Sequence, residues 1–144
     1  MKELSTKNLK FRLAKMDDAD FILKLRLEKG SYLSQTNVDV AAQVQWLSAY
    51  KIREKNKEEY YFVISHNGEN VGVVRVYNLT SDSFEWGSWI LKNNLPFNFA
   101  LESVLLIYDF GFNHLGLSTA FFDVRKENKK VLAFHKMFYK ARLI

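Results

Sequence analysis

The chain has 144 residues, of which 48% are hydrophobic and 15% aromatic, so it holds enough apolar material for one packed core and a single domain over residues 1–144. It contains no cysteine, which excludes disulfides, thiolate nucleophiles and cysteine-based zinc sites and fits a reducing cytoplasm. The formal net charge of +5 suits an anionic small molecule or nucleic acid as partner, and no apolar run is long enough for a signal peptide or a membrane span.

The first third of the sequence predicts a strand followed by two helices. Leu9–Leu13 alternates apolar and polar residues, which is the period of a strand. Asp17 or Asp18 is placed to cap a helix that ends at Gly30. A second helix is expected after Asp39, and it fades into a charged run that we interpret as a solvated helix end and loop.

The middle of the chain predicts three consecutive antiparallel strands. Tyr60–His66 and Val71–Tyr77 are rich in β-branched and aromatic residues, and Asn67-Gly68 between them is a strong hairpin signal. Ser83–Leu91 is the third strand, after a short polar turn.

The last part of the chain predicts a helix, a strand and a second helix. The first helix, Asn98–Leu115, is apolar on nearly every side and must therefore be covered on more than one face. Ser118–Val124 is a strand, and the helical crossover before it makes it parallel to the strand that precedes the helix. Glu127 or Asn128 starts a last helix, and Ala141–Ile144 begins a final strand.

This order of elements, with a strand–turn–helix unit at Ser83–Leu117, resembles the GNAT N-acetyltransferase superfamily over almost the whole chain. The most specific segment is Val124–Phe138, which is similar to the family's late pattern V-x-x-x-N-x-x-A/V-x-x-L/F-Y/H-x-x-x-G-F. The nearest branches are those that acetylate amino-sugar nucleotides or ribosomal-protein N-termini. The resemblance implies an α+β fold with a mixed, mostly antiparallel central sheet, helices on both faces and C-terminal strands that are short or missing here.

The resemblance implies acetyl-CoA as co-substrate and no metal. A strand that leads directly into a helix N-terminus leaves backbone N–H groups for an anion, which suits the coenzyme pyrophosphate. The resemblance implies that the pantetheine arm pairs with the backbone of the strand Ser83–Leu91 around Trp89 to Leu91. The expected coenzyme-binding residues are Trp89, Ile90, Leu91, Lys92, Phe97, Asn98, Phe99, Ala100 and Asn128.

The pyrophosphate loop departs from the family pattern Q/R-x-x-G-x-G/A. Leu95, Asn98 and Ala100 stand at the three marked positions, so Leu95 offers no charge and Asn98 replaces a glycine. Asparagine is the non-glycine residue best suited to a left-handed backbone. An ordinary turn with Asn94 and Pro96 is the alternative interpretation.

Acetyl transfer to an amine requires a neutral amine, a polarised thioester and a stabilised leaving thiolate. His135 stands where family members often carry the tyrosine that protonates the thiolate, and a core or surface histidine is the alternative. Glu85, between two aromatic residues, is a candidate base, or else an outward-facing residue that pairs with Arg75. Tyr139 replaces the glycine of the closing G-F and is a reserve acid.

The acceptor is expected to be a primary amine on a small molecule such as an amino sugar. Trp46, Tyr32, Tyr77 and Trp86 are candidates for an acceptor pocket, with core packing as the alternative for each. A protein N-terminus as acceptor, and a non-catalytic acyl-CoA-binding or regulatory module, remain open.

The expected partners are few. We expect either that the chain is truncated after Ile144 or that a partner subunit covers the sheet edge that the short C-terminus leaves. The second interpretation predicts a homodimer. We expect no membrane and no nucleic acid, since the basic group at residues 125–130 is too short for a convincing patch.

Overall fold

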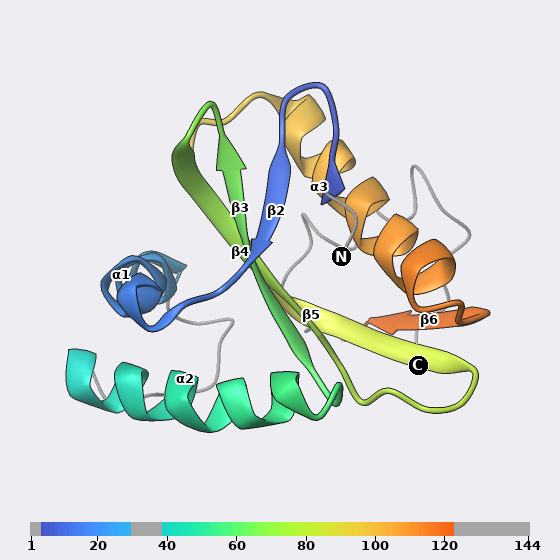
Figure 1. Ribbon diagram of the computed structural model, residues 1–144. Helices are drawn as coiled ribbons and strands as arrows, with labels where there is room; N and C mark the ends of the chain where they lie inside the picture. Colours follow the sequence, from blue (N-terminus) through green and yellow to red (C-terminus); the bar gives the residue numbers. More distant parts are fainter. Residues whose placement is uncertain (1–3, 30–38, 123–144) are drawn as a thin grey trace.

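The computed structural model describes residues 4–29 and 39–122 (Figure 1). In this part of the chain the strands are β1 (Leu4–Ser5), β2 (Lys10–Leu13), β3 (Tyr60–His66), β4 (Glu69–Tyr77), β5 (Ser83–Leu91) and β6 (Thr119–Phe122). The helices are α1 (Ala19–Lys29), α2 (Val40–Lys55) and α3 (Phe97–Asp109), with a 3-10 turn at Met16–Asp18 and a π-helical turn at Phe110–His114. No helix among these is long and apolar enough to cross a membrane.

The strands form one sheet in the order β1-β2-β3-β4-β5-β6. Neighbouring strands are antiparallel except for β5 and β6, which are parallel and are connected through α3. The prediction of a mixed, mostly antiparallel sheet is therefore confirmed. The predicted parallel strand after the long helix is confirmed as well, because β6 lies inside the range predicted for it.

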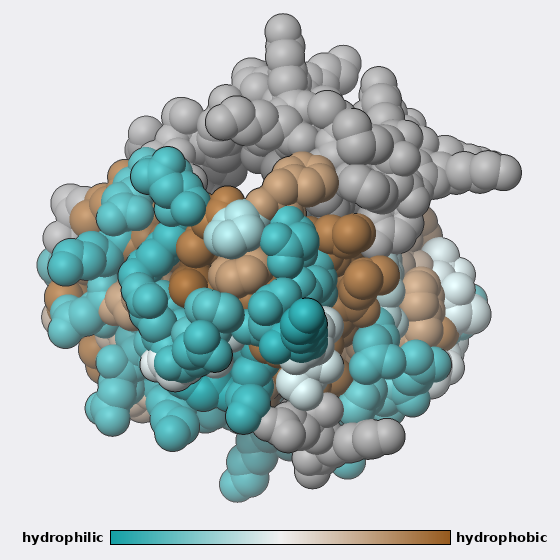
Figure 2. Space-filling view, turned by 90° about the horizontal axis from the view of Figure 1, so that it is seen from above, coloured by the Kyte–Doolittle hydropathy of each residue, from teal (hydrophilic) through white to brown (hydrophobic). Residues whose placement is uncertain are grey.

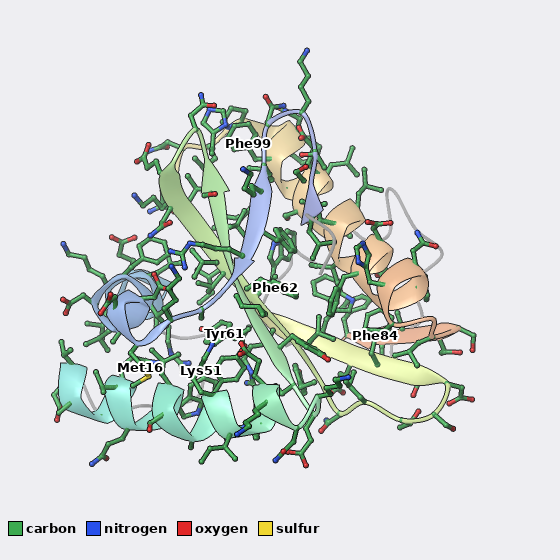
Figure 3. The ribbon with its side chains drawn as sticks, viewed as in Figure 1. Met16, Lys51, Tyr61, Phe62, Phe84 and Phe99 are labelled. Atoms are coloured by element: carbon green, nitrogen blue, oxygen red, sulfur yellow. The ribbon has the colours of Figure 1, made fainter. Side chains whose placement is uncertain are left out.

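Helices cover both faces of the sheet, as predicted (Figure 1). Alternate residues of β3 divide the core into two clusters: Phe62 and Ile64 pack with α3 on one face, and Tyr61 and Val63 pack with α1 and α2 on the other. Figure 3 shows Tyr61 on the side of α2 and Phe62 on the side of α3. We call these faces the α3 face and the α1/α2 face.

Local signals account for most of the element boundaries. Asn67 and Gly68 have φ values of 49° and 83°, which is the left-handed geometry of a two-residue hairpin turn. Asp39 caps α2, since its carboxylate accepts a hydrogen bond of 2.6 Å from the Ala42 N–H. The carboxylate of Asp18 accepts from the Lys15 N–H at 2.7 Å just before α1.

α2 ends at Lys55, inside the charged run that was expected to hold its solvated end, so this prediction is confirmed. One other boundary differs from the prediction. The helix expected at Asn98–Leu115 begins one residue earlier, and its last turn, Phe110–His114, is π-helical. The helix predicted from Glu127 or Asn128 and the strand fragment Ala141–Ile144 lie outside the described residues.

β5 contains a bulge in its second half. The register places two residues of β5, Ser88 and Trp89, opposite the single residue Val74 of β4. Ser88 has a φ of 49° at this point. The extra residue changes the alternation, so that Trp86 and Trp89 both pack on the α3 face while Ile90 packs on the α1/α2 face.

Candidate functional site

The N-terminus of α3 offers backbone N–H groups without a side-chain cap. Pro96 occupies the cap position and provides no side-chain hydrogen bond. The Phe99 N–H donates to the Pro96 carbonyl at 3.0 Å, whereas Phe97 and Asn98 are exposed. This end of the molecule is seen from above in Figure 2, where polar and apolar surfaces lie side by side. An uncapped first turn with a positive dipole end can accept an anion.

Asn98 is engaged by a carboxylate on its own helix. Its side-chain amide donates to Glu102 at 2.9 Å. Glu102 also accepts from the Asn8 side chain at 2.7 Å and from the Thr6 hydroxyl, so it fastens the start of the chain to α3. Desolvation alone would raise the pKa of Glu102, but these hydrogen bonds outweigh it and lower the pKa to about 2. An anion at the start of α3 would therefore depend on the backbone N–H groups rather than on the Asn98 side chain.

The other residues expected to hold pyrophosphate differ in their accessibility. Lys92 lies 3.4 Å from Glu69 in an exposed ion pair, which contributes little and leaves Lys92 able to exchange partners. The Phe99 side chain is in the core of the α3 face, with its ring centroid 4.8 Å from that of His66. Ala100 is half-buried. The buried side chain of Phe99 is therefore not accessible to a ligand.

The second half of β5 is the predicted place of the coenzyme arm. The described pairing with β6 runs from Ser83 to Trp86 of β5, while the pairing with β4 extends to Leu91. The Trp89 indole donates to the Ser103 hydroxyl at 3.0 Å, which fixes this half of the strand to α3. Ile90 is buried on the α1/α2 face. The role of Trp89, Ile90 and Leu91 in holding coenzyme stays a prediction.

A buried carboxylate organises the polar end of the α1/α2 face. Glu59, only 4% exposed, lies between α2 and β3. It accepts a hydrogen bond from Nε of Arg53 on α2 and one of 2.7 Å from Nε of Arg75 on β4. A carboxylate shared by two guanidiniums is well compensated in a buried position.

Both guanidiniums lie over the indole ring of Trp46. The guanidinium carbons of Arg53 and Arg75 lie 5.3 and 5.2 Å from its ring centroids. The Arg75 guanidinium also stacks on Tyr77, at 4.6 Å from the ring centroid. The structure thus brings together two of the predicted acceptor-pocket residues, Trp46 and Tyr77. Trp86 is not beside them, because the strand alternation directs it into the core of the α3 face.

Glu85 lies on the same face as Tyr77, its register partner across β4 and β5. It is half-buried and accepts a hydrogen bond of 2.8 Å from the Asn78 side chain. The alternative partner considered for Glu85, Arg75, is instead bonded to Glu59. Glu85 is therefore a half-buried carboxylate without a guanidinium partner in the described part of the chain.

A hollow of about 430 Å³ opens where α2, the loop after it and the end of β4 meet. It is lined by Arg53, Lys57, Glu58, Glu59, Arg75, Tyr77, Asn78 and Leu79. Sequence reasoning identified only Tyr77 among these as a site residue. The missed signal was Glu59, an acidic residue directly before an aromatic strand, which the charged run around it concealed.

Four predicted site residues, His135, Tyr139, Asn128 and Tyr32, lie outside the described residues. Within the described ranges no cluster of histidine, cysteine and carboxylate side chains is suited to hold a metal ion.

Comparisons with known proteins identify the family. A family model described as an acetyltransferase (GNAT) domain matches residues 8–137. Among solved structures, the chain is similar to apo FdhC, described as a nucleotide-linked sugar GNAT, with 38% identity and a TM-score of 0.88 over 99% of this chain and 83% of that one.

Two more distant structures are similar in fold. Ribosomal-protein-S5-alanine acetyltransferase from Vibrio fischeri has 16% identity and a TM-score of 0.80, over 95% of this chain and 81% of that one. Mycobacterium smegmatis RimJ, in complex with CoA-disulfide, has 20% identity and a TM-score of 0.77, over 89% of this chain and 68% of that one. A comparison with curated proteins finds no match. The family match and the sheet topology lead to the same conclusion: this chain belongs to the GNAT acetyltransferase family.

Proposed function

We propose that this protein transfers an acetyl group from acetyl-CoA to the primary amine of a nucleotide-linked amino sugar. The observation that carries the proposal is the 38% identity to a nucleotide-linked sugar GNAT, over 99% of this chain. The ribosomal-protein acetyltransferase from Vibrio fischeri, at 16% identity, supports the fold alone. An amino sugar is therefore preferred to a protein N-terminus as acceptor.

Acetyl-CoA supplies the acetyl group as an activated thioester. The uncapped first turn of α3, with Phe97 and Asn98 exposed, supports binding of its pyrophosphate by backbone N–H groups. The backbone of Trp89–Leu91 is proposed to hold the pantetheine arm along the edge of β5 away from β4. Lys92 adds positive charge at the same end of the strand.

Glu85 is proposed as the base that accepts a proton from the acceptor amine, directly or through one water. Its place on the Tyr77 face and its half-buried carboxylate support this role. The amine nitrogen then forms a bond to the acetyl carbon, the carbon–sulfur bond breaks, and the thiolate takes up a proton. His135 is proposed as the donor of that proton, with Tyr139 in reserve.

Mass spectrometry of a substrate panel tests the proposal. The purified protein is incubated with acetyl-CoA and nucleotide-linked amino sugars, a polyamine, or short peptides with unmodified N-termini. We expect acetylation of a nucleotide-linked amino sugar and of no peptide. Exclusive acetylation of a peptide or the polyamine would refute the amino-sugar assignment.

A matched pair of variants tests the base. Glu85→Gln keeps an acceptor for Asn78 and removes the carboxylate, so kcat should fall about 10²-fold or more. Glu28→Gln makes the same change at an exposed position of α1 and should leave kcat unchanged. Equal kcat values in the two variants would exclude Glu85 as base.

A coenzyme-binding module without turnover is the second candidate. Leu95, which stands where the family pattern has a basic or amide residue, packs against the core of the α3 face and cannot serve a phosphate. A thermal shift with acetyl-CoA tests coenzyme binding, which both candidates require and which raises the stability of the native state. The amine panel then separates them, because only the enzyme transfers the acetyl group. Stabilisation without transfer to any amine in the panel would favour the module.

A further inference from the structure

The hollow beside Glu59 has an excess of positive charge. Its lining contains three cationic side chains, Arg53, Lys57 and Arg75, and two carboxylates, Glu58 and Glu59. Glu59 is bonded to both arginines, whereas Lys57 has no ion pair in the described part of the chain and is exposed. One positive charge therefore remains uncompensated at the opening.

The two guanidiniums are held in fixed orientations. Arg53 is anchored through Nε to Glu59, which is almost fully buried, and Arg75 is anchored to it through Nε and Nη2. Both guanidiniums stack on Trp46. Among the described residues nothing accepts a hydrogen bond from the terminal amino groups of Arg53. Arginine presents several N–H donors in one plane, a geometry that matches phosphate oxygens. Because the anchoring already restricts these side chains, a ligand would lose little further entropy on binding them.

The loop that carries Lys57 is also fixed. Lys57 has a left-handed φ of 60°, and its N–H donates to the Glu54 carbonyl at 3.0 Å. The Glu58 N–H donates to the Arg53 carbonyl at 2.9 Å. These bonds also satisfy carbonyl groups at the end of α2 that would otherwise repel an anion.

The hollow lies close to the proposed base. Tyr77 lines the hollow and is the register partner of Glu85. The Tyr77 side chain packs over Gly87 of β5: its hydroxyl is 2.7 Å from the position that a Cβ on Gly87 would occupy. Gly87 directly follows Trp86, the last residue of β5 in the described pairing with β6. Tyr77 therefore connects the lining of the hollow with the face of β5 that carries Glu85.

From this arrangement we propose that the hollow binds the diphosphate of the acceptor through Arg53, Arg75 and Lys57, with the sugar against Tyr77. The inference rests on the proposed function, because it assumes an acceptor that carries a nucleoside diphosphate. It assigns to Arg53 and Arg75, the two arginines bonded to Glu59, a ligand-binding role that a purely structural ion-pair network would not have.

Equilibrium binding tests the site without catalysis. The protein is first saturated with coenzyme A, so that the α3 N-terminus is filled. It is then titrated with uridine diphosphate or inorganic diphosphate while tryptophan fluorescence, to which Trp46 contributes, and heat are recorded. Lys57→Gln should weaken binding about fivefold, as expected for one exposed charge pair, and Arg53→Lys should weaken it by removing the planar donor set. Lys24→Gln, at an exposed position of α1 outside the hollow, is the matched control and should bind as the wild type does.

Kinetics with two acceptors complete the test. For a nucleotide-linked amino sugar, Lys57→Gln should raise KM more than it lowers kcat. The same sugar without phosphate should show a much smaller difference between the variant and the wild type. Absence of diphosphate binding to the coenzyme-loaded protein, or equal binding by wild type and Lys57→Gln, would overturn the inference even if acetyl transfer occurs. Diphosphate binding that Lys57→Gln weakens would support the site even if no amino sugar is acetylated.

Discussion

Replacing Tyr50 with phenylalanine removes one hydroxyl group from the core of the α1/α2 face. The hydroxyl accepts a hydrogen bond of 2.7 Å from the backbone N–H of Tyr61 and donates one of 2.6 Å to Glu54. β2 leaves β3 at this point: the Ala14 N–H bonds the Tyr61 carbonyl at 2.8 Å, and the last register pair is Leu13 with Phe62. The Tyr50 hydroxyl therefore takes the place of a strand carbonyl.

The cost of the change follows from burial. Tyr50 and Tyr61 are both 0% exposed, so water cannot replace the lost acceptor. A buried N–H without a partner costs about 1–3 kcal/mol. Glu54 retains its ion pair with Lys51 at 2.8 Å and adds little to this cost. We expect Tyr50→Phe to lower the free energy of unfolding by about 2 kcal/mol, which corresponds to a fall in Tm of about 6 °C for a domain of this size.

Urea unfolding, followed by far-UV circular dichroism, measures the change as a lower midpoint at constant slope. Tyr60→Phe is the matched control, because Tyr60 is a half-buried neighbour whose hydroxyl makes no hydrogen bond in the described part of the chain. It should alter the free energy of unfolding by less than about 0.5 kcal/mol. A loss below that limit in Tyr50→Phe, or equal losses in both variants, would refute the reasoning.

Two further predictions concern the other face of the sheet. Gly111→Ala places a Cβ 2.1 Å from the ring of Phe84, so it should destabilise the fold by about 2 kcal/mol through overpacking; an unchanged urea midpoint would contradict this. The pKa of Glu102 falls from 4.5 to about 2 in the folded state, so its contribution to stability is present above about pH 4.5 and is lost as pH falls towards 2. Glu102→Gln should therefore reduce the decrease in Tm across this range, and an unaltered pH profile would exclude the effect.

Periodicity and turn chemistry account for the predictable part of the fold. The strands of the meander were predictable because Asn67-Gly68 tolerates the positive φ values that the turn requires. The π-helical turn at Phe110–His114 was not predictable, because apolar residues on nearly every side of the helix conceal its packing face. The contact between Gly111 and Phe84, 27 residues apart in sequence, arises only after β5 and α3 are packed.

The site was less predictable than the fold. Glu85 and Tyr77 could be placed near each other, since both lie on strands with a clear alternation. The partner of Arg75 could not be predicted, because Glu59 stands at the end of a charged run that gives no sign that its carboxylate is buried. Strand alternation would have separated Trp86 from Tyr77, since Trp86 lies on one face of β5 and Glu85, the register partner of Tyr77, lies on the other.

The order of the sheet has a consequence for how the protein assembles. In the described part of the chain, every strand lies beside its predecessor in sequence, from β1 to β6. No strand has to insert between two that are already paired, so the sheet can grow by addition at one edge as the ribosome delivers the chain. Separations between paired residues are small in the β3-β4-β5 meander, whereas β2 and β3 pair across the two helices, with Lys10 opposite Ser65. Because short separations favour rapid folding, we expect the meander to form first. β6, the last described strand in the chain, then extends a meander that can already have formed as the chain leaves the ribosome.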